Sequence, residues 1–138
     1  MEEEILEEEL SMNPSVPQIK LLLLKSRETY LIGTVTELDE EPSILVENCY
    51  EIIECAEYGA DPKSLKQRAS KIEGKYHQTS LQLVDENDGK DWWALEYIIL
   101  RPYPKYSSQR DLFLTSDSIF TILDPEPGVL DLYRKVAG

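Results

Sequence analysis

The sequence predicts a mainly β protein built on a small, strongly bent sheet, and three observations lead to that prediction. Apolar and polar residues alternate with a period of two over much of residues 18–53, which is typical of antiparallel strands. Gly33 lies inside one of these alternating runs, and a glycine within a strand marks the kind of bend that small barrels need to close. Two short apolar runs near the C-terminal end, at residues 111–114 and 118–123, supply the last strands.

The first part of the sheet is predicted to be a meander of three consecutive strands. The strands are expected at residues 18–25, 29–37 and 43–53. The polar residues 26–28 and the acidic residues 38–42 form the two tight turns between them. Strict alternation in the third strand would place Val46 and Asn48 on one face and Cys49 on the other.

Residues 54–110 break this strand pattern and are predicted to be an insertion. Asp61 and Pro62 are expected to begin a short helix that runs to Lys71, with Asp61 as the N-cap. The apolar runs 79–84 and 92–101 flank an Asp-Gly turn, which predicts a hairpin. The insertion also holds the most basic part of the chain, at Lys63, Lys66, Arg68, Lys71 and Lys75. That part is either a solvated loop or a basic surface that meets a partner or nucleic acid.

The two ends of the chain have amphipathic patterns. Val129, Leu132, Tyr133 and Val136 recur at helical spacing, so a C-terminal helix is expected. The N-terminal twelve residues contain six glutamates beside a few apolar residues. They fit either an acidic helix that docks on the sheet or on a neighbouring subunit, or a frayed acidic tail.

Together, the first three strands and the last two resemble the Sm and Sm-like (LSm) family of ring-forming, RNA-associated proteins. Gly33 is followed six residues later by Asp39 and four residues after that by Ser43 and an apolar pair, where the family has Gly, Asp and Asn. Residues 112–122 are similar to the second family motif, in which two short strands flank an Arg-Gly turn. The chain resembles in particular the divergent Sm-like proteins of marine phages and cyanobacteria.

The resemblance implies a single Sm-like domain over residues 1–138. Its fold would be a five-stranded open barrel with an N-terminal helical segment, an enlarged loop and hairpin between the third and fourth strands, and a C-terminal helix. The parts would be an acidic N-terminal segment (1–17), a first Sm-like motif (18–53), an insertion (54–110), a second motif (111–123) and the C-terminal helix (124–138).

The resemblance also implies a homo-oligomeric ring, because family members pair their fourth strand with the fifth strand of the next subunit. Short apolar strand edges promote aggregation unless something covers them, and head-to-tail pairing that closes on itself covers them all. We therefore expect a ring of about five to seven subunits. The expected interface consists of apolar residues of the last two strands: Leu112, Phe113, Leu114, Ile119, Phe120 and Ile122.

In Sm proteins an RNA base is held by two loops, through a stacking residue, an Asn and an Arg. The matching positions here are Asp39, Pro42, Ser43, Thr115 and Ser116. Pro42 stands at the stacking position and Thr115 at that of the Arg, so the planar surface and the cation are both missing. Because stacking contributes about 1–3 kcal/mol per base, uridine-tract binding at the pore is expected to be lost. The retained Asp39 is expected to order its own loop.

A second candidate RNA surface combines aromatic and cationic residues away from these loops. Its members are Trp92, Trp93, Tyr97, Arg101, Tyr103, Lys105 and Arg110. Such a mixture suits single-stranded nucleic acid, but the same alternation also fits a strand covered on both faces. The net charge of −13 opposes RNA binding, and removing the six N-terminal glutamates still leaves −7 on the rest of the chain.

No catalytic motif is found. The sequence lacks a nucleophile elbow, a phosphate-binding glycine loop and a metal-spaced His/Cys set, and its one histidine, His77, lies in a polar stretch. We therefore predict no enzyme activity, no cofactor and no metal. With no run of about 20 apolar residues and an acidic start unlike a signal peptide, the expected location is the cytoplasm of a bacterium or a phage-infected cell. Two functions stay open: a ring associated with RNA, and a ring scaffold that binds proteins and has lost RNA binding.

Overall fold

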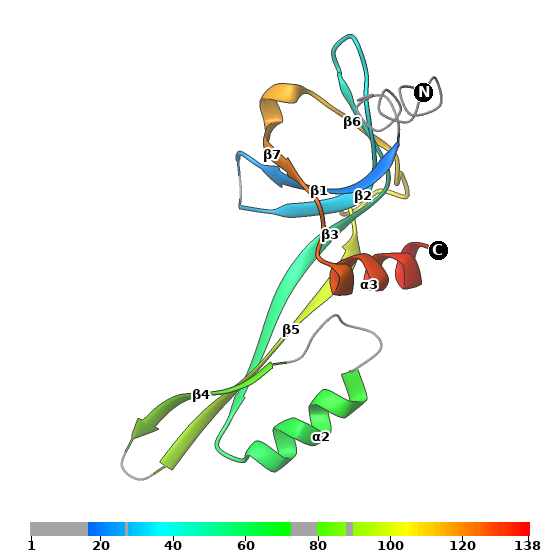
Figure 1. Cartoon of the computed structure of the whole chain (residues 1–138). Coiled ribbons are helices and arrows are strands. Elements are labelled where there is room, and N and C mark those ends of the chain that lie inside the picture. Colours follow the sequence, from blue (N-terminus) through cyan, green and yellow to red (C-terminus); the bar gives the residue numbers. More distant parts are fainter. Residues whose placement is uncertain (1–16, 27, 73–79, 88–89) are drawn as a thin grey trace, which may run out of the picture. The chain divides into compact units, whose positions relative to one another are not determined.

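The computed structural model describes residues 17–26, 28–72, 80–87 and 90–138 and is mainly β, as predicted (Figure 1). The described residues form one antiparallel sheet of seven strands: β1 (Gln18–Leu24), β2 (Tyr30–Glu37), β3 (Ile44–Gly59), β4 (Ser80–Asn87), β5 (Lys90–Pro102), β6 (Leu112–Leu114) and β7 (Ile119–Leu123). The strand order is β4-β5-β3-β2-β1-β7, and β6 pairs with β3. The described helices are α2 (Pro62–Ile72), α3 (Pro127–Ala137) and the short 3₁₀ turn η1 (Ser116–Ser118), and none is long and apolar enough to cross a bilayer.

The strands begin and end close to the predicted positions, with one clear exception. β3 continues to Gly59, six residues beyond the predicted end. Exposed residues (Glu54, Ala56 and Tyr58) alternate there with half-buried ones, which fits a strand with one exposed face. The expected N-terminal helical segment lies outside the described residues.

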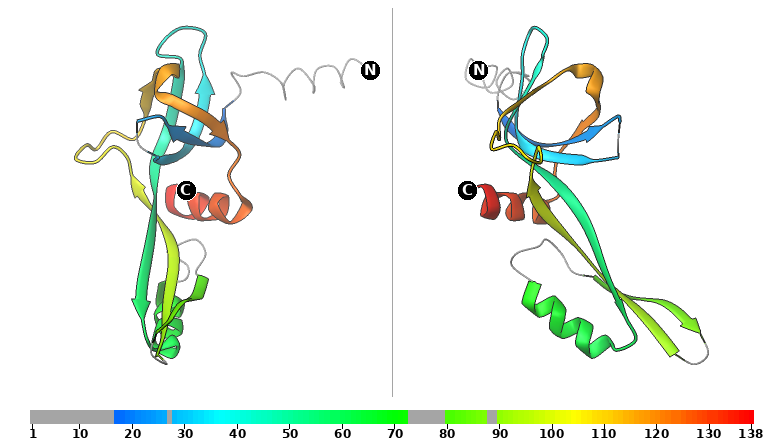
Figure 2. Two further views of the ribbon diagram at one scale, coloured as in Figure 1. Left: turned by 90° about the vertical axis from the view of Figure 1, so that its left-hand side faces the viewer. Right: turned by 180° about the vertical axis from the view of Figure 1, so that it is seen from behind.

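The described chain forms two compact units. The first contains the residues up to Glu51 together with Pro102–Pro125, and the second contains Ile52–Arg101 and Glu126–Gly138. In the first unit, β1, β2 and β7 curl around the start of β3 (Figure 2). The core there is formed by the inward residues of these strands, namely Leu22, Leu31, Val35, Ile44, Val46, Cys49 and Ile119.

A β-bulge interrupts the pairing of β2 with β3. Ile32 lies opposite Tyr50 and Thr34 opposite Glu47, so Asn48 and Cys49 together face Gly33 alone. Asn48 has a φ of 50°, the left-handed conformation that a bulge residue commonly needs. The extra residue reverses the alternation, so Cys49 rather than Asn48 is buried beside Val46, and the face assignment from strict alternation was wrong at these two positions.

Residues far along the chain satisfy the backbone groups of the bulge. The Asn48 amide donates to Oδ1 of Asp111 (3.1 Å), and the Cys49 amide donates to the Arg110 carbonyl (2.9 Å). The Tyr103 amide in turn donates to the Cys49 carbonyl (3.1 Å). The connector between β5 and β6 is thereby fastened to the bulge.

Burial also raises the pKa of the Cys49 thiol to about 12, which keeps it protonated and unreactive.

In the second unit, α2 packs on the β4–β5 hairpin. Leu65 and Ile72 of the helix bury against Leu95, and Trp93 and Tyr97 pack beside them. The helix begins as predicted: Oδ1 of Asp61 accepts a bond from the Lys63 amide (3.0 Å) and Oδ2 from the Ser64 hydroxyl (2.8 Å). α3 also forms where predicted, with Val129, Leu132 and Tyr133 buried and Val136 exposed near its end.

The bulge explains why residue 33 is a glycine, and this gives a first testable prediction. A Cβ atom at Gly33 would lie 2.6 Å from Cγ1 of Val46 and 2.8 Å from the Glu47 carbonyl oxygen. Because one of these atoms is backbone, Gly33→Ala should lower the free energy of unfolding by about 1–3 kcal/mol in urea denaturation.

Gly59→Ala is the matched control, since a Cβ at Gly59 would meet only the Leu65 side chain at an ordinary 3.8 Å. Its effect on the unfolding free energy should stay within about 0.5 kcal/mol. Equal losses in the two variants would show that the close approach at Gly33 is not a constraint on the fold.

Candidate functional site

Sheet pairing brings two loops of the first unit together. Glu37 pairs with Ile44 at the end of the β2–β3 hairpin, and Ile44 also pairs with Leu114 of β6. The loop of residues 38–43 and the turn of residues 115–118 therefore start from neighbouring strand ends. These are the two segments that the sequence analysis matched to the RNA-binding loops of Sm proteins.

The Glu41 side chain joins the two loops. Its carboxylate oxygens accept hydrogen bonds from the amide and hydroxyl of Ser43, both at 3.1 Å. Across the gap, the Ser116 amide donates to Oε2 at 3.3 Å, and the Ser116 hydroxyl donates to Oε1. We call Glu41, Ser43 and Ser116 the carboxylate clasp. In the clasp, the Glu41 carboxylate alone accepts hydrogen bonds from four donors, which are the amides and hydroxyls of Ser43 and Ser116.

The carboxylate clasp holds a negative charge in place. The hydrogen bond from the Ser116 hydroxyl, helped by those from the Ser116 amide and from the amide and hydroxyl of Ser43, holds the pKa of Glu41 below its ordinary 4.5, although desolvation opposes this. The neighbouring Asp39 and Glu40 side chains are exposed on the same loop. At neutral pH the paired loops therefore present carboxylates to solvent.

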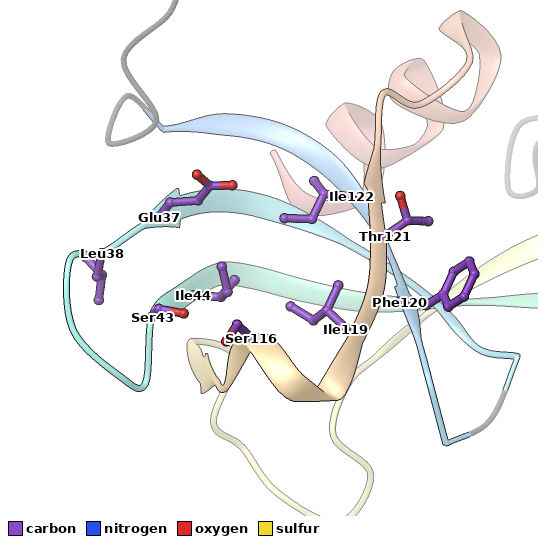
Figure 3. A pocket seen from close by; sticks show the side chains of 9 residues that line it. All are labelled: Glu37, Leu38, Ser43, Ile44, Ser116, Ile119, Phe120, Thr121 and Ile122. Carbon is purple, nitrogen blue, oxygen red and sulfur yellow. The ribbon is translucent and has the colours of Figure 1, made fainter.

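A groove of about 390 Å³ opens beside the carboxylate clasp (Figure 3). It is lined by Glu37, Leu38, Ser43, Ile44 and Ser116 and by four consecutive residues of β7, Ile119, Phe120, Thr121 and Ile122. Ile44 and Ile119 are buried and belong to the core, so they form an apolar floor. Four consecutive residues of one strand can line a groove only where the groove follows the backbone edge, since successive side chains point to opposite faces.

Only some of the predicted loop residues come together in the structure. Ser43 and Ser116 meet at the carboxylate clasp, whereas Asp39, Pro42 and Thr115 are exposed beside it. No hydrogen bond of the Asp39 side chain is found within the described residues, so the expected ordering of the loop comes from Glu41 instead. Glu41 was not among the predicted site residues. The one local signal for its role was its position two residues before Ser43 in a short turn, where a carboxylate can accept hydrogen bonds from the serine.

The aromatic and cationic residues of the second candidate surface are divided between the two units. Trp93 and Tyr97 pack against the α2 core, and Tyr103 packs against the core of the first unit. Arg101 is half-buried, and the Arg110 guanidinium donates to the carbonyls of Ser107 and Gln109. Trp92, which is 45% exposed, and Lys105 face solvent. RNA binding by this set stays a prediction.

The expected interface residues fall into an inward and an outward group. Leu112, Leu114, Ile119 and Ile122 belong to the core of the first unit or pack against it. Phe113 and Phe120 are 59% and 70% exposed, which is unusual for phenylalanine. β6 pairs with β3 and β7 with β1, and no further strand partner of either is found among the described residues.

The described part of the chain contains no group of three His, Cys, Asp or Glu side chains arranged to hold a metal ion. His77 lies outside the described residues. The chemistry that the site offers is therefore a fixed carboxylate, an apolar groove and a backbone edge.

The carboxylate clasp gives a prediction about pH. Because the folded state lowers the pKa of Glu41 below 4.5, its ionised form stabilises the fold at neutral pH. That contribution should disappear as the pH falls through the lowered pKa. Glu41→Gln should reduce the melting temperature near pH 7, and the difference from the original chain should shrink as the pH falls well below 4.5.

Glu40→Gln is the control, because it removes a charge from the same loop without touching the clasp. A loss of melting temperature in Glu41→Gln that is no larger than in Glu40→Gln, or that persists in acid, would show that the clasp does not stabilise the loops.

Comparison with known proteins identifies the family of the chain but no individual relative. No curated protein matches it, and no solved structure matches it either. One family model matches residues 17–138, which include all of the described strands and helices. The chain therefore belongs to DUF6561, a family of unknown function.

Proposed function

We propose that this protein is a non-catalytic scaffold whose copies join edge to edge through β6 and β7 into a closed ring of Sm type. The observation that supports this most is the groove along β7. It follows four consecutive residues of an edge strand, and it has an apolar floor beside a phenylalanine that is 70% exposed. An extended segment of another chain fits such a groove by adding to the sheet.

The second copy supplies a suitable segment in β6. This strand presents Phe113 outward and uses one edge to pair with β3. A β6 edge placed against a β7 edge satisfies backbone groups of both strands and buries Phe113 and Phe120 together. Because the two surfaces differ, the contact is head to tail, and it removes all free edges only when it closes into a ring.

A five-stranded open barrel is part of the same proposal. The order β7-β1-β2-β3, with β6 on the first residues of β3, supports it. The bulge opposite Gly33 bends β2 and β3 where a small barrel has to turn. About five to seven subunits would complete the ring, with the number set by the rotation from one subunit to the next.

The competing function is RNA binding at the paired loops, and the carboxylate clasp opposes it. The hydroxyl and amide donors of Ser43 and Ser116, which could otherwise meet a base or phosphate, are bonded to Glu41. Asp39 and Glu40 add negative charge nearby, and a chain of net charge −13 repels a polyanion unless cations gather locally. We therefore favour protein partners for the ring.

The assembly is tested by light scattering and native mass spectrometry of the purified chain. The expected mass is about five to seven times the 15.9 kDa of one chain. Phe120→Asp places a charge in the proposed contact and should yield monomers. Tyr106→Asp is the control, because Tyr106 is a fully exposed aromatic residue away from both edges, and it should leave the ring intact. A mass of 15.9 kDa for the unaltered chain would refute the ring.

RNA binding is tested separately by fluorescence anisotropy with uridine-rich and adenosine-rich oligonucleotides at about 50 mM salt. We expect no saturable binding at micromolar protein. Saturable binding that Arg101→Ala or Lys66→Ala weakens would instead support an RNA-associated ring, whatever the mass of the assembly.

A further inference from the structure

In the second unit, α2 covers one face of β5, and the other face of this strand carries an exposed tryptophan. Trp93, Leu95 and Tyr97 belong to the core that α2 shares with the hairpin. Trp92 and Glu96 alternate with these residues along the strand and are exposed. Because successive side chains of a strand point to opposite faces, Trp92 and Glu96 lie on the face turned away from α2.

The neighbouring part of β3 is divided in the same way. Glu57 pairs with Arg68 of α2 at 3.1 Å, and a Cβ at Gly59 would lie 3.8 Å from a leucine of the same helix. These odd-numbered positions therefore face α2. Tyr58 and Glu54 alternate with them and lie on the opposite face, where both are exposed.

The exposed residues of the two strands form one continuous strip, because β3 and β5 are neighbours in the sheet. On the helix side, the Tyr97 hydroxyl donates a hydrogen bond to the Glu57 carboxylate, so the two strands lie side by side at this level. On the other face, Tyr58 follows Glu57 and Glu96 precedes Tyr97, which makes Tyr58 and Glu96 cross-strand neighbours. Along β5 the strip covers about 13 Å. We call Glu54, Tyr58, Trp92 and Glu96 the outer strip.

The outer strip combines aromatic and acidic side chains at the surface. Tyr58 is 65% exposed and Trp92 45%. Tryptophan and tyrosine next to charged residues are typical of the anchor points of protein interfaces. Glu54 and Glu96 are the charged members of the strip, and no hydrogen bond or ion pair of either is found among the residues that the structure describes. A partner that complements the strip therefore carries positive charge.

We propose that the outer strip binds an arginine-containing segment of a partner protein. A guanidinium group both pairs with a carboxylate and stacks on an aromatic ring, and the outer strip offers these two kinds of group side by side. The two carboxylates repel phosphate groups, so a basic protein segment suits the strip better than nucleic acid does. The inference does not depend on the ring, because all four residues belong to the second unit of a single chain.

The probe for this site is a synthetic peptide of about ten residues in which arginine alternates with leucine, and its control has glutamate in place of arginine. Fluorescence anisotropy of the labelled peptides with the full chain, at about 150 mM salt, should show saturable binding of the arginine peptide alone. Unlabelled arginine peptide should also change the tryptophan emission of the chain. In Trp92→Phe the remaining tryptophan is Trp93, which packs in the α2 core, and the emission should not respond.

Paired charge variants test the carboxylates. Glu54→Gln combined with Glu96→Gln should weaken binding of the arginine peptide about two- to thirtyfold, as two exposed ion pairs allow. Glu40→Gln combined with Asp131→Asn removes the same charge from exposed positions outside the outer strip, and it should leave the affinity unchanged.

Paired aromatic variants test the stacking surface. Tyr58→Ala should weaken binding about two- to fivefold, the effect of losing an exposed cation–π contact. Tyr106→Ala removes a fully exposed tyrosine of the first unit and should have no effect.

Equal affinities in the strip variants and their controls, with all variants folded by circular dichroism, would overturn the proposal, as would equal binding of the two peptides or no binding of either. A Trp92 emission change caused by an oligonucleotide would instead make nucleic acid the occupant. A change caused by raising the concentration of the protein alone, and lost in Tyr58→Ala, would make a second copy the occupant. Either result would also contradict the proposal.

Discussion

The first unit depends on one constraint, which is that two residues of β3 must fit opposite a single residue of β2. Gly33 makes this possible because it leaves room for Val46 and for the backbone at Glu47. The bulge turns Cys49 into the core and directs the amides of Asn48 and Cys49 away from the β2 ladder. Amides that leave a sheet ladder need other acceptors, and the connector before β6 supplies them at Arg110 and Asp111.

This connection also positions the candidate site. Once residues 110–111 are bonded to the bulge, β6 follows directly and pairs with the first three residues of β3. The turn after β6 then lies beside the loop before β3, where Glu41 reaches Ser116. A bend in the sheet is thus linked, through a few hydrogen bonds, to a carboxylate that closes two loops and to a groove along β7.

As part of the proposed function, we favour contact with proteins over contact with nucleic acid at this site. Its donors are already bonded to Glu41, its exposed charges are negative, and its groove offers apolar surface and a strand edge. Positive charge is concentrated on α2, whose residues 62–72 include three lysines, one arginine and no acidic residue.

Local signals in the sequence were enough to predict most elements of the fold. Asp61-Pro62 predicted where α2 starts, and the helical spacing of Val129, Leu132 and Tyr133 predicted α3. Gly33 predicted a bend, but not the residue at which β3 changes phase, because a bulge depends on partners in β2 and in a connector more than 50 residues away. Glu41 was missed for the same reason, since Ser116 lies 75 residues away and only the fold brings it near.

Amide hydrogen exchange, followed residue by residue, tests the role of the bulge most directly. The bonds of the Asn48 and Cys49 amides to the connector should make these two amides exchange only with global unfolding, as slowly as amides of the β1–β2 ladder. Exchange as fast as that of the exposed loop at Glu40, under conditions where β1 and β2 stay protected, would contradict the account.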